Sequence, residues 1–406
     1  MVNRPDGMLS FIQYYLDINM FFLHLTKHAK RRKTFWPLNP GHDFELLFSF
    51  KIYFMKKDGK MQPYEMKDDQ RRIYIDAAQL HEAYMDAFIK YRTYRGGMHW
   101  KKSKGKEYLF RSLDRYGYGK SLGPRSGETE LTYHEFHNKK KQLLARLKHL
   151  KDRLKGQARY CKAARIARVP RTVTAILRLL EQHQLLGRNL QVIGTNALYA
   201  YEARAGIFLE HGLLATQDMD VLWDIRPKLR IFAIDKVDNK GFIDILQKAD
   251  RSFELLSKKS FRAVNQAGYM VDLVKSEPKS ILRKENRQMD GYDDLMAAEL
   301  NNLQWLVPAP KISQIVIGDD GYPSTMVVPD PRAFAIHKLW LSERIDRNAI
   351  KKKRDRSQAL AVCKLILQYL PEFKFKQKDL RIFPKTILAE AVQAFDSSDL
   401  PPGYKE

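Results

Sequence analysis

The chain has 406 residues, of which 44% are hydrophobic, and its lysines and arginines outnumber its acids by 72 to 47. This composition argues against a disordered chain, since it suffices for at least one full hydrophobic core and predicts two or three domains. The net charge of +25 indicates an anionic partner, such as a nucleotide or a nucleic acid. Cys161 and Cys363 are too few for a disulfide framework or a cysteine zinc site, and they indicate a reducing, cytoplasmic setting.

Residues 1–60 show weak periodicity and are predicted to be a poorly specified N-terminal extension. The aromatic-rich stretch from Phe11 to Leu25 is interrupted by polar residues and is too short to span a bilayer. It also lacks the small-residue cleavage site of a signal peptide. We therefore expect no membrane partner, and we hypothesise that translation starts later, for instance at Met55 or Met61.

Residues 61–156 are predicted to form a helical and basic N-terminal region. A helix is expected from Ile75 to Tyr91, and the glycine-punctuated stretch from Lys101 to Glu130 is typical of a strand followed by an ordered loop. A second helix is expected from Thr132 to Lys155, and it packs either on its own domain, which we favour, or on a coiled-coil partner. The leucines of its single apolar stripe are Leu143, Leu147, Leu150 and Leu154.

Gly156 is predicted to end that helix, and residues 157–187 resemble a helix, a Val-Pro turn and a second helix. Such a helix-turn-helix contacts nucleic acid in some proteins, whereas in the alternative the two helices only brace the neighbouring domain. The arginines available for nucleic acid in the first case are Arg159, Arg165, Arg168 and Arg171.

Residues 188–330 alternate strand-like runs with helices, which predicts a central domain of the α/β (α+β) class with a mixed sheet. This core is expected to end in a hairpin whose turn is formed by Asp319, Asp320 and Gly321. Residues 331–406 are predicted to be helical, with a basic run from Lys351 to Arg354 between two amphipathic helices. Helical N-terminal and C-terminal regions thus flank the core.

Two carboxylates, Asp218 and Asp220, flank Met219 at the start of an apolar strand. Because side chains alternate along a strand, both carboxylates point to the same face, about 6.6 Å apart. Like charges so placed attract divalent cations, and Mg²⁺ prefers oxygen ligands. Two such ions, about 3.5–4 Å apart, would stabilise the attacking and leaving oxygens of an in-line displacement.

Two further features belong to the same predicted site. Asp272 is a lone acid inside the apolar strand GYMVDLVK, where a buried carboxylate needs a metal or a charged partner. The turn formed by Gly194, Thr195 and Asn196 lies between a strand and a helix, so its backbone N–H groups and the positive helix end are suited to phosphate.

The order of these motifs resembles the nucleotidyltransferase superfamily, which has a polymerase-beta-like fold. A narrower resemblance is to a bacterial nucleotidyltransferase family with abortive-infection and toxin-type relatives. It rests on VIGTNALYAYEA, ATQDMDVLWD, GYMVDLVKS, PRAFAIHKLWLS, KKKRDRSQAL and KSLGPRSGETE. The chain departs from the pattern at Thr195, where Ser or Gly is usual, and in the 24 positions from Gly194 to Asp218. This longer spacing predicts an extra turn of helix or a loop.

The resemblance implies transfer of a nucleoside monophosphate from a triphosphate such as ATP to an acceptor hydroxyl. The implied ligands of two Mg²⁺ ions, or of Mn²⁺ in their place, are Asp218, Asp220 and Asp272, the last of which also suits the role of base. Gly194 and Thr195 would seat the phosphates.

Two residues of the C-terminal region complete the implied nucleotide site. Lys338 in HKLW and Asp355 in KKRD match the nucleotide-binding positions of the toxin-type relatives. Without the resemblance, Lys338 is equally well explained as a surface lysine, and Asp355 as a salt-bridge partner of Arg354 or Arg356. His211 and His337 are expected to be structural rather than metal ligands.

The basic segment KSLGPR offers Lys120, Ser121 and Arg125 to a triphosphate or to an RNA backbone. The net charge and the arginines from Arg159 to Arg171 favour RNA, such as tRNA, as the acceptor. The alternatives are an enzyme that nucleotidylates a protein or a small molecule, and a catalytically degenerate protein of the same fold that binds nucleic acid. The oligomeric state is left open.

Overall fold

The computed structural model describes residues 64–114, 117–225, 241–277, 294–300 and 303–396. All of them belong to one compact unit, residues 50–406. The predicted extension over residues 1–60, with the hypothesised starts at Met55 and Met61, lies outside the described residues. No helix in the described part of the chain combines the length and the apolar character needed to cross a membrane.

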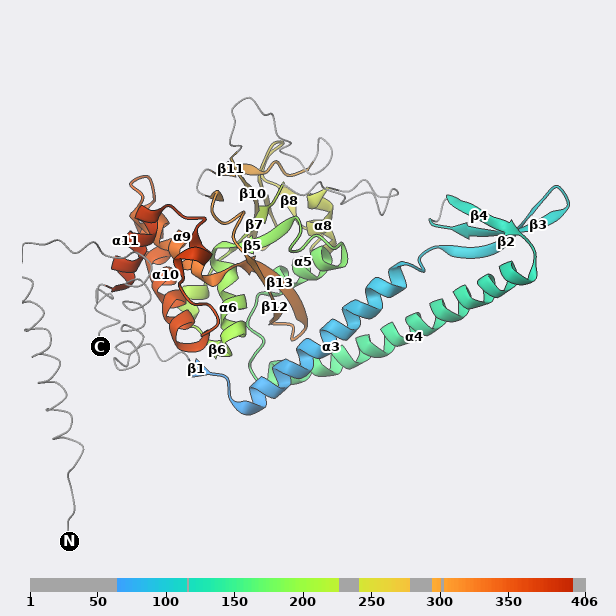
Figure 1. The fold of residues 1–406 in the computed structure, drawn as a ribbon, viewed down its shortest axis with the longest axis horizontal. Helices are drawn as coiled ribbons and strands as arrows, with labels where there is room; N and C mark the ends of the chain where they lie inside the picture. The colour runs from blue at the N-terminus through green and yellow to red at the C-terminus, as the bar shows by residue number, and fades with distance from the viewer. Residues whose placement is uncertain (1–63, 115–116, 226–240, 278–293, 301–302, 397–406) are drawn as a thin grey trace, which may run out of the picture. The chain divides into compact units, whose positions relative to one another are not determined.

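A mixed sheet of six strands forms the centre of the fold, and this confirms the predicted α/β class (Figure 1). Its strands are β5 (Leu190–Ile193), β7 (Asp218–Trp223), β8 (Glu254–Leu255), β9 (Arg262–Val264), β10 (Met270–Ser276) and β11 (Ala298–Leu300). The order is β5-β7-β10-β9-β8, with β11 paired to β10. β7 and β10 are parallel, whereas β5 and β9 run antiparallel to their neighbours. In β7 and β10 every apolar residue except Met270 is buried, on both faces of the sheet.

A hairpin of two seven-residue strands, β12 (Lys311–Ile317) and β13 (Pro323–Pro329), closes the core as predicted. Gly321 in its turn has a φ of +84°, and a Cβ there would lie 2.1 Å from the carbonyl oxygen of Ala158. Glycine is therefore required both by the backbone conformation and by the close approach of the neighbouring chain.

Helices surround this core and continue to the end of the described residues. They are α5 (Arg171–Gln182), α6 (Ala197–Ala205), α8 (Phe242–Ala249), α9 (Pro331–Glu343), α10 (Ala349–Tyr369) and α11 (Lys385–Asp396). Figure 1 shows α9, α10 and α11 together on one side of the core, next to α6. The helical C-terminal region is thus confirmed, but the basic run from Lys351 to Arg354 lies inside α10 rather than between two helices.

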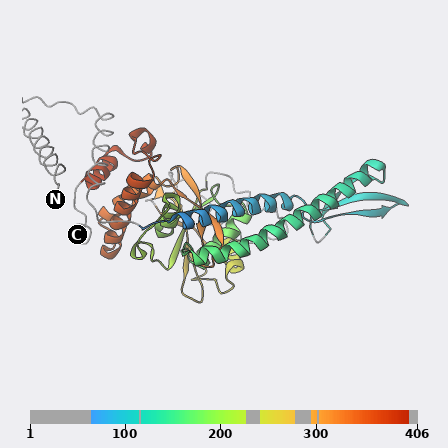
Figure 2. The ribbon, with the colours of Figure 1, turned by 90° about the horizontal axis from the view of Figure 1, so that it is seen from below.

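Two long helices, α3 (Asp68–Arg92) and α4 (Gly127–Ala163), pack side by side, as Figures 1 and 2 both show. They are joined by a three-stranded antiparallel sheet of β2 (Gly97–Ser103), β3 (Lys106–Ser112) and β4 (Gly119–Pro124). The sequence predicted only one strand and a loop in this stretch. The predicted strand corresponds to β3, and β2 and β4 were missed because lysines and glycines dilute their alternating pattern.

The prediction that Gly156 ends a helix is wrong, because α4 continues through it to Ala163. A single glycine costs a helix only about 1 kcal/mol. The buried side chains of Leu154, Ala158 and Cys161 continue the apolar face past this glycine and stabilise the helix there. The segment 157–187 is therefore no separate helix-turn-helix, since its first helix is the end of α4 and its second is α5.

Among the arginines proposed for nucleic acid in that segment, Arg168 is already engaged. Its guanidinium forms an ion pair with Glu202 at 2.9 Å and donates to the carbonyl oxygen of Leu209. Arg159, Arg165 and Arg171 are exposed. The bracing alternative therefore accounts for Arg168.

The leucine stripe of α4 packs on the chain's own helix α3, as we favoured over a coiled-coil partner. Leu150 and Leu154 form one buried cluster with Leu80 and Ala87 of α3, and Leu147 packs against it. The stripe thus stabilises the helix pair from within.

Replacement of Leu150 by alanine should lower the free energy of unfolding by about 2–4 kcal/mol, because this side chain is only 7% exposed and its removal leaves a cavity. Chemical denaturation of the full chain measures the change. Leu144, which is 52% exposed on the same helix, is the matched control, and Leu144→Ala should change stability by less than about 0.5 kcal/mol. Equal effects of the two substitutions would contradict this packing.

Candidate active site

The glycine turn after β5 holds one of the predicted metal-binding carboxylates. Gly194 begins a short 3-10 helix, η1 (Gly194–Asn196), which leads directly into α6. Its φ is +66°, and a Cβ there would lie 2.2 Å from Oδ2 of Asp220. The Asp220 carboxylate therefore rests against the backbone of the turn, and only glycine satisfies both the conformation and the contact.

Asp218 occupies the first position of β7 and is fixed through its backbone and its side chain. Its carbonyl oxygen accepts hydrogen bonds from Asn196 Nδ2 at 2.6 Å and from the Tyr269 hydroxyl at 3.3 Å. The Thr216 hydroxyl donates to its carboxylate. Asp218 also lines an open pocket together with Thr216 and Arg354, so its carboxylate remains accessible to a ligand.

Asp272 on β10 is the direct neighbour of Asp220 in the parallel pair with β7. Paired residues of adjacent strands share a face, so the predicted third carboxylate lies beside the other two. In this structure both carboxylate oxygens of Asp272 accept hydrogen bonds from Arg262, with N–O distances of 2.7 and 2.6 Å. Arg262 lies on β9, the strand on the other side of β10 from β7. This two-pronged ion pair supplies the charged partner that a buried aspartate requires.

The metal site predicted from the sequence is therefore only partly assembled. Within the described ranges, no three His, Cys, Asp or Glu side chains are gathered closely enough to hold one ion. Asp218 and Asp220 still form an oxygen-only donor set that suits Mg²⁺. Asp272 could join them only after releasing Arg262.

The three carboxylates repel one another, and this repulsion contributes to a raised pKa of Asp220. Burial raises the pKa of Asp220 to about 6, and the negative charges of Asp218 and Asp272 add to the rise. The positive charges of Lys338 and Lys351 act in the opposite direction. Two lysines from the C-terminal helices thus partly offset the negative charge around Asp220.

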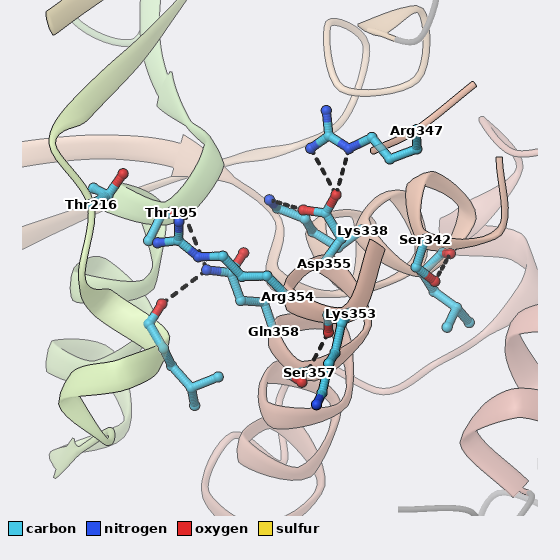
Figure 3. A network of polar contacts seen from close by, with 12 residues as sticks. Thr195, Thr216, Lys338, Ser342, Arg347, Lys353, Arg354, Asp355, Ser357 and Gln358 are labelled. Atoms are coloured by element: carbon cyan, nitrogen blue, oxygen red, sulfur yellow. Dashed lines mark hydrogen bonds and ion pairs between the residues drawn. The ribbon is translucent and has the colours of Figure 1, made fainter. Parts of the chain in front are cut away.

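Lys338 on α9 is buried, and its ammonium nitrogen lies 2.6 Å from Oδ1 of Asp355 on α10. The other carboxylate oxygen of Asp355 accepts from Arg347, at 2.8 Å from Nε (Figure 3). The explanation of Lys338 as an ordinary surface lysine is therefore wrong. So is the pairing of Asp355 with Arg354 or Arg356, because Arg354 donates to the Ala215 carbonyl and Arg356 pairs with Glu343.

Thr195 is held from the C-terminal region as well. Its hydroxyl accepts a hydrogen bond from Gln358 Nε2 at 3.2 Å, and the same nitrogen donates to the Leu213 carbonyl at 2.9 Å (Figure 3). Leu213 belongs to α7 (His211–Leu214), a one-turn helix inside the long spacing between Gly194 and Asp218. Of the two alternatives that this spacing predicted, an extra turn of helix or a loop, the structure has a helical turn, and Gln358 connects it to the turn at Thr195.

Several residues at the site were not predicted. Arg262 was detectable in principle, because it lies in the strand-like run SFRAVN shortly before GYMVDLV, and antiparallel pairing of these two runs places it opposite Asp272. Lys351 and Arg354 were noted only as part of a basic run. Arg347 and Gln358 carry no local signal, because they act on side chains of other elements.

The remaining predicted residues lie elsewhere. Lys120 and Ser121 are on β4 and Arg125 follows it, so all three belong to the small sheet rather than to the surroundings of the carboxylates (Figure 1). Arg125 forms ion pairs with Glu107 and Glu130. Of the two histidines expected to be structural, His337 is buried, with its ring 6.1 Å from that of Trp340, whereas His211 is exposed at the start of α7.

A family model described as a nucleotidyltransferase matches residues 171–383, which is more than half of the chain. The match begins with α5, contains all three strand acids, and extends past Lys338 and Asp355. The chain belongs to this nucleotidyltransferase family, as its motifs predicted. Comparison with curated proteins and with solved structures found no match.

Replacement of Gly194 by alanine should destabilise the protein by at least about 1 kcal/mol, because alanine is strained at this φ and its methyl group would displace the Asp220 carboxylate. Thermal unfolding measures the change. Gly212 on α7 is the matched control, because a Cβ there would meet nothing within 4 Å, so Gly212→Ala should be neutral or stabilising. A Gly194→Ala protein as stable as wild type would contradict the contact.

Removal of the Asp220 charge should stabilise the metal-free protein above pH 6. The pKa is 3.8 for an ordinary aspartate and about 6 for Asp220 in the fold, so the folded state holds this proton more tightly than the unfolded chain. Stability present at low pH is therefore lost as the pH rises from about 4 through 6, by about 2–3 kcal/mol. Denaturation in the presence of a chelator measures this loss.

In the Asp220→Asn protein, most of this decrease in stability with rising pH should be absent. It should match wild type near pH 4 and exceed it above pH 6, provided that both are compared at the same salt concentration. A variant that is less stable than wild type at pH 8 would show that neighbouring cations outweigh the repulsion from Asp218 and Asp272.

Proposed function

We propose that the protein transfers a nucleoside monophosphate from a nucleoside triphosphate to an acceptor hydroxyl. The observation that carries the proposal is the position of Asp220, seated on the Gly194 turn with Asp218 and Asp272 on the same face of the sheet. In the reaction, the acceptor oxygen forms a bond to the α-phosphorus, the bond to the β-phosphate oxygen breaks, and pyrophosphate leaves.

Asp218 and Asp220 would hold the divalent cations, two Mg²⁺ ions or Mn²⁺ in their place. Their donor set consists of oxygens alone, and the pocket beside Asp218 leaves room for further ligands from a triphosphate. When bound, such ions offset the charge that develops on the attacking and leaving oxygens.

Asp272 is proposed as a third ligand or as the base that accepts the proton of the acceptor hydroxyl. Either role requires Arg262 to release its carboxylate, since both oxygens are occupied by the guanidinium. The freed guanidinium would remain at the site as a cation suited to phosphate.

The triphosphate would rest on the turn of Gly194 and Thr195, where the N-terminus of α6 presents backbone N–H groups. Lys338 and Lys351 supply positive charge beside it, as their effect on the pKa of Asp220 indicates. Asp355 would act on the nucleotide through Lys338, whose ammonium group it holds in place. Arg347 in turn fixes Asp355 through its other carboxylate oxygen.

RNA, such as tRNA, is the proposed acceptor, on the basis of the net charge of +25, and a cytoplasmic setting is proposed with it. A protein or a small molecule is the alternative acceptor. A degenerate protein that only binds nucleic acid is the second candidate function, favoured by the Arg262–Asp272 ion pair, which removes one acid from the site.

Magnesium-dependent transfer of label from an α-phosphate-labelled triphosphate tests the proposal. Asp218→Asn should reduce transfer by more than about 100-fold, since loss of a partner outside the first ligand shell already costs 10- to 100-fold. The control is Asp319→Asn, because Asp319 is exposed in the turn between β12 and β13 and should be dispensable.

A screen of the four nucleoside triphosphates against total RNA and protein, with mass detection, identifies the donor and the acceptor in the same experiment. Transfer that persists in a chelator would contradict the metal dependence. Absence of transfer to RNA, protein and small molecules would favour the degenerate alternative.

A further inference from the structure

The small sheet of β2, β3 and β4 has one face covered by α4. Met98 and Leu109 of the sheet form a buried cluster with Phe136 of α4, against which Trp100 and Leu122 pack. Because side chains alternate along a strand, the neighbours of these residues point to the opposite face. We call that opposite side the outer face, and its residues are His99, Lys101, Lys106, Tyr108, Phe110 and Ser121.

Aromatic rings gather on the outer face without being buried in a core. His99 pairs with Phe110 across the strands, with ring centroids 5.6 Å apart, and Tyr108 lies two positions away on β3. His99 is exposed, and Tyr108 and Phe110 are half-buried. Gly119 brings the backbone of β4 against the edge of the Phe110 ring, so that no side chain from this position covers it.

Positive charge surrounds these rings. Lys101 pairs with Tyr108, and its ammonium nitrogen lies 5.3 Å from the centroid of Phe110. Lys104 and Lys106 follow at the β2–β3 turn, and both are exposed. Among the described residues of the outer face none is acidic, because Glu107 belongs to the other face and pairs with Arg125.

We infer that the outer face binds single-stranded RNA, whose bases stack on His99, Tyr108 and Phe110 while the lysines contact the phosphates. Base stacking on aromatic side chains requires a base released from a duplex, and an open sheet face with nearby cations provides such a platform. Binding itself is independent of the chemistry at the carboxylates. That the bound strand is the acceptor rests on the proposed function.

Fluorescence anisotropy of the full chain with a labelled uridine-only RNA of about eight nucleotides tests the inference, since one such platform binds strands of this length. Phe110→Leu keeps an apolar side chain but removes the aromatic face, and should weaken binding about tenfold. His99→Ala, at an exposed position, should weaken it severalfold without affecting the fold.

Lys101→Ala should reduce the slope of log affinity against log salt by about 0.7, the value for one phosphate contact of a single strand. Tyr160→Ala is the matched control, because Tyr160 is an aromatic side chain that is 64% exposed on α4, and its removal should leave affinity unchanged.

Unchanged affinity in both Phe110→Leu and His99→Ala, with wild-type thermal unfolding, would overturn the inference. Equal affinity for a duplex of the same length would overturn it too, because charge alone would then explain binding. The Asp218→Asn protein separates the two proposals. It should bind the RNA as wild type does, so loss of label transfer with intact binding bears only on catalysis.

Discussion

Repulsion among three carboxylates on two adjacent strands is the constraint around which this fold is arranged. Asp220 lies between Asp218 on its own strand and Asp272 on the next, in a buried setting that raises its pKa to about 6. The neighbouring elements supply the space and the positive charge that this cluster of like charges requires. The Gly194 turn leaves space for a carboxylate, β9 contributes Arg262, and the C-terminal helices bring Lys338 and Lys351.

This arrangement explains why the family match extends from α5 well into the C-terminal helices rather than ending with the sheet. The sheet alone compensates Asp272 through Arg262 but supplies no such cation to Asp218 and Asp220 among its described strands. α10 carries Asp355, which orients Lys338, and Gln358, which holds Thr195 and α7. The C-terminal helices therefore fix both Lys338 and the turn at Thr195.

The Arg262–Asp272 ion pair is central to the choice between an enzyme and a degenerate relative. A guanidinium with both contacts to one carboxylate is a strong competitor for a metal ion. A triphosphate would give Arg262 another anionic partner. Divalent cations would give Asp272 another source of positive charge. Under the proposed function, the pair would stabilise the site without substrate and would open when substrate binds.

Local pattern was sufficient for the sheet strands that carry the acids, for the hairpin turn and for the glycine at position 194. Alternation along a strand and the conformational demand of a turn depend only on neighbouring residues. The same local reasoning failed at Gly156, where packing of α4 outweighs the cost of one glycine, and in the small sheet, where the alternation is weak.

The amino-acid sequence by itself determined the family, the strand acids and the glycine turn at position 194, because each corresponds to a short contiguous motif. Only the tertiary structure decided what those groups touch. Gln358 reaches Thr195 across 163 positions, and Arg347 and Lys338 converge on Asp355 from different segments. Such pairings depend on how the helices pack against the sheet. Contacts between distant segments produce no periodic pattern in the sequence from which they could be predicted.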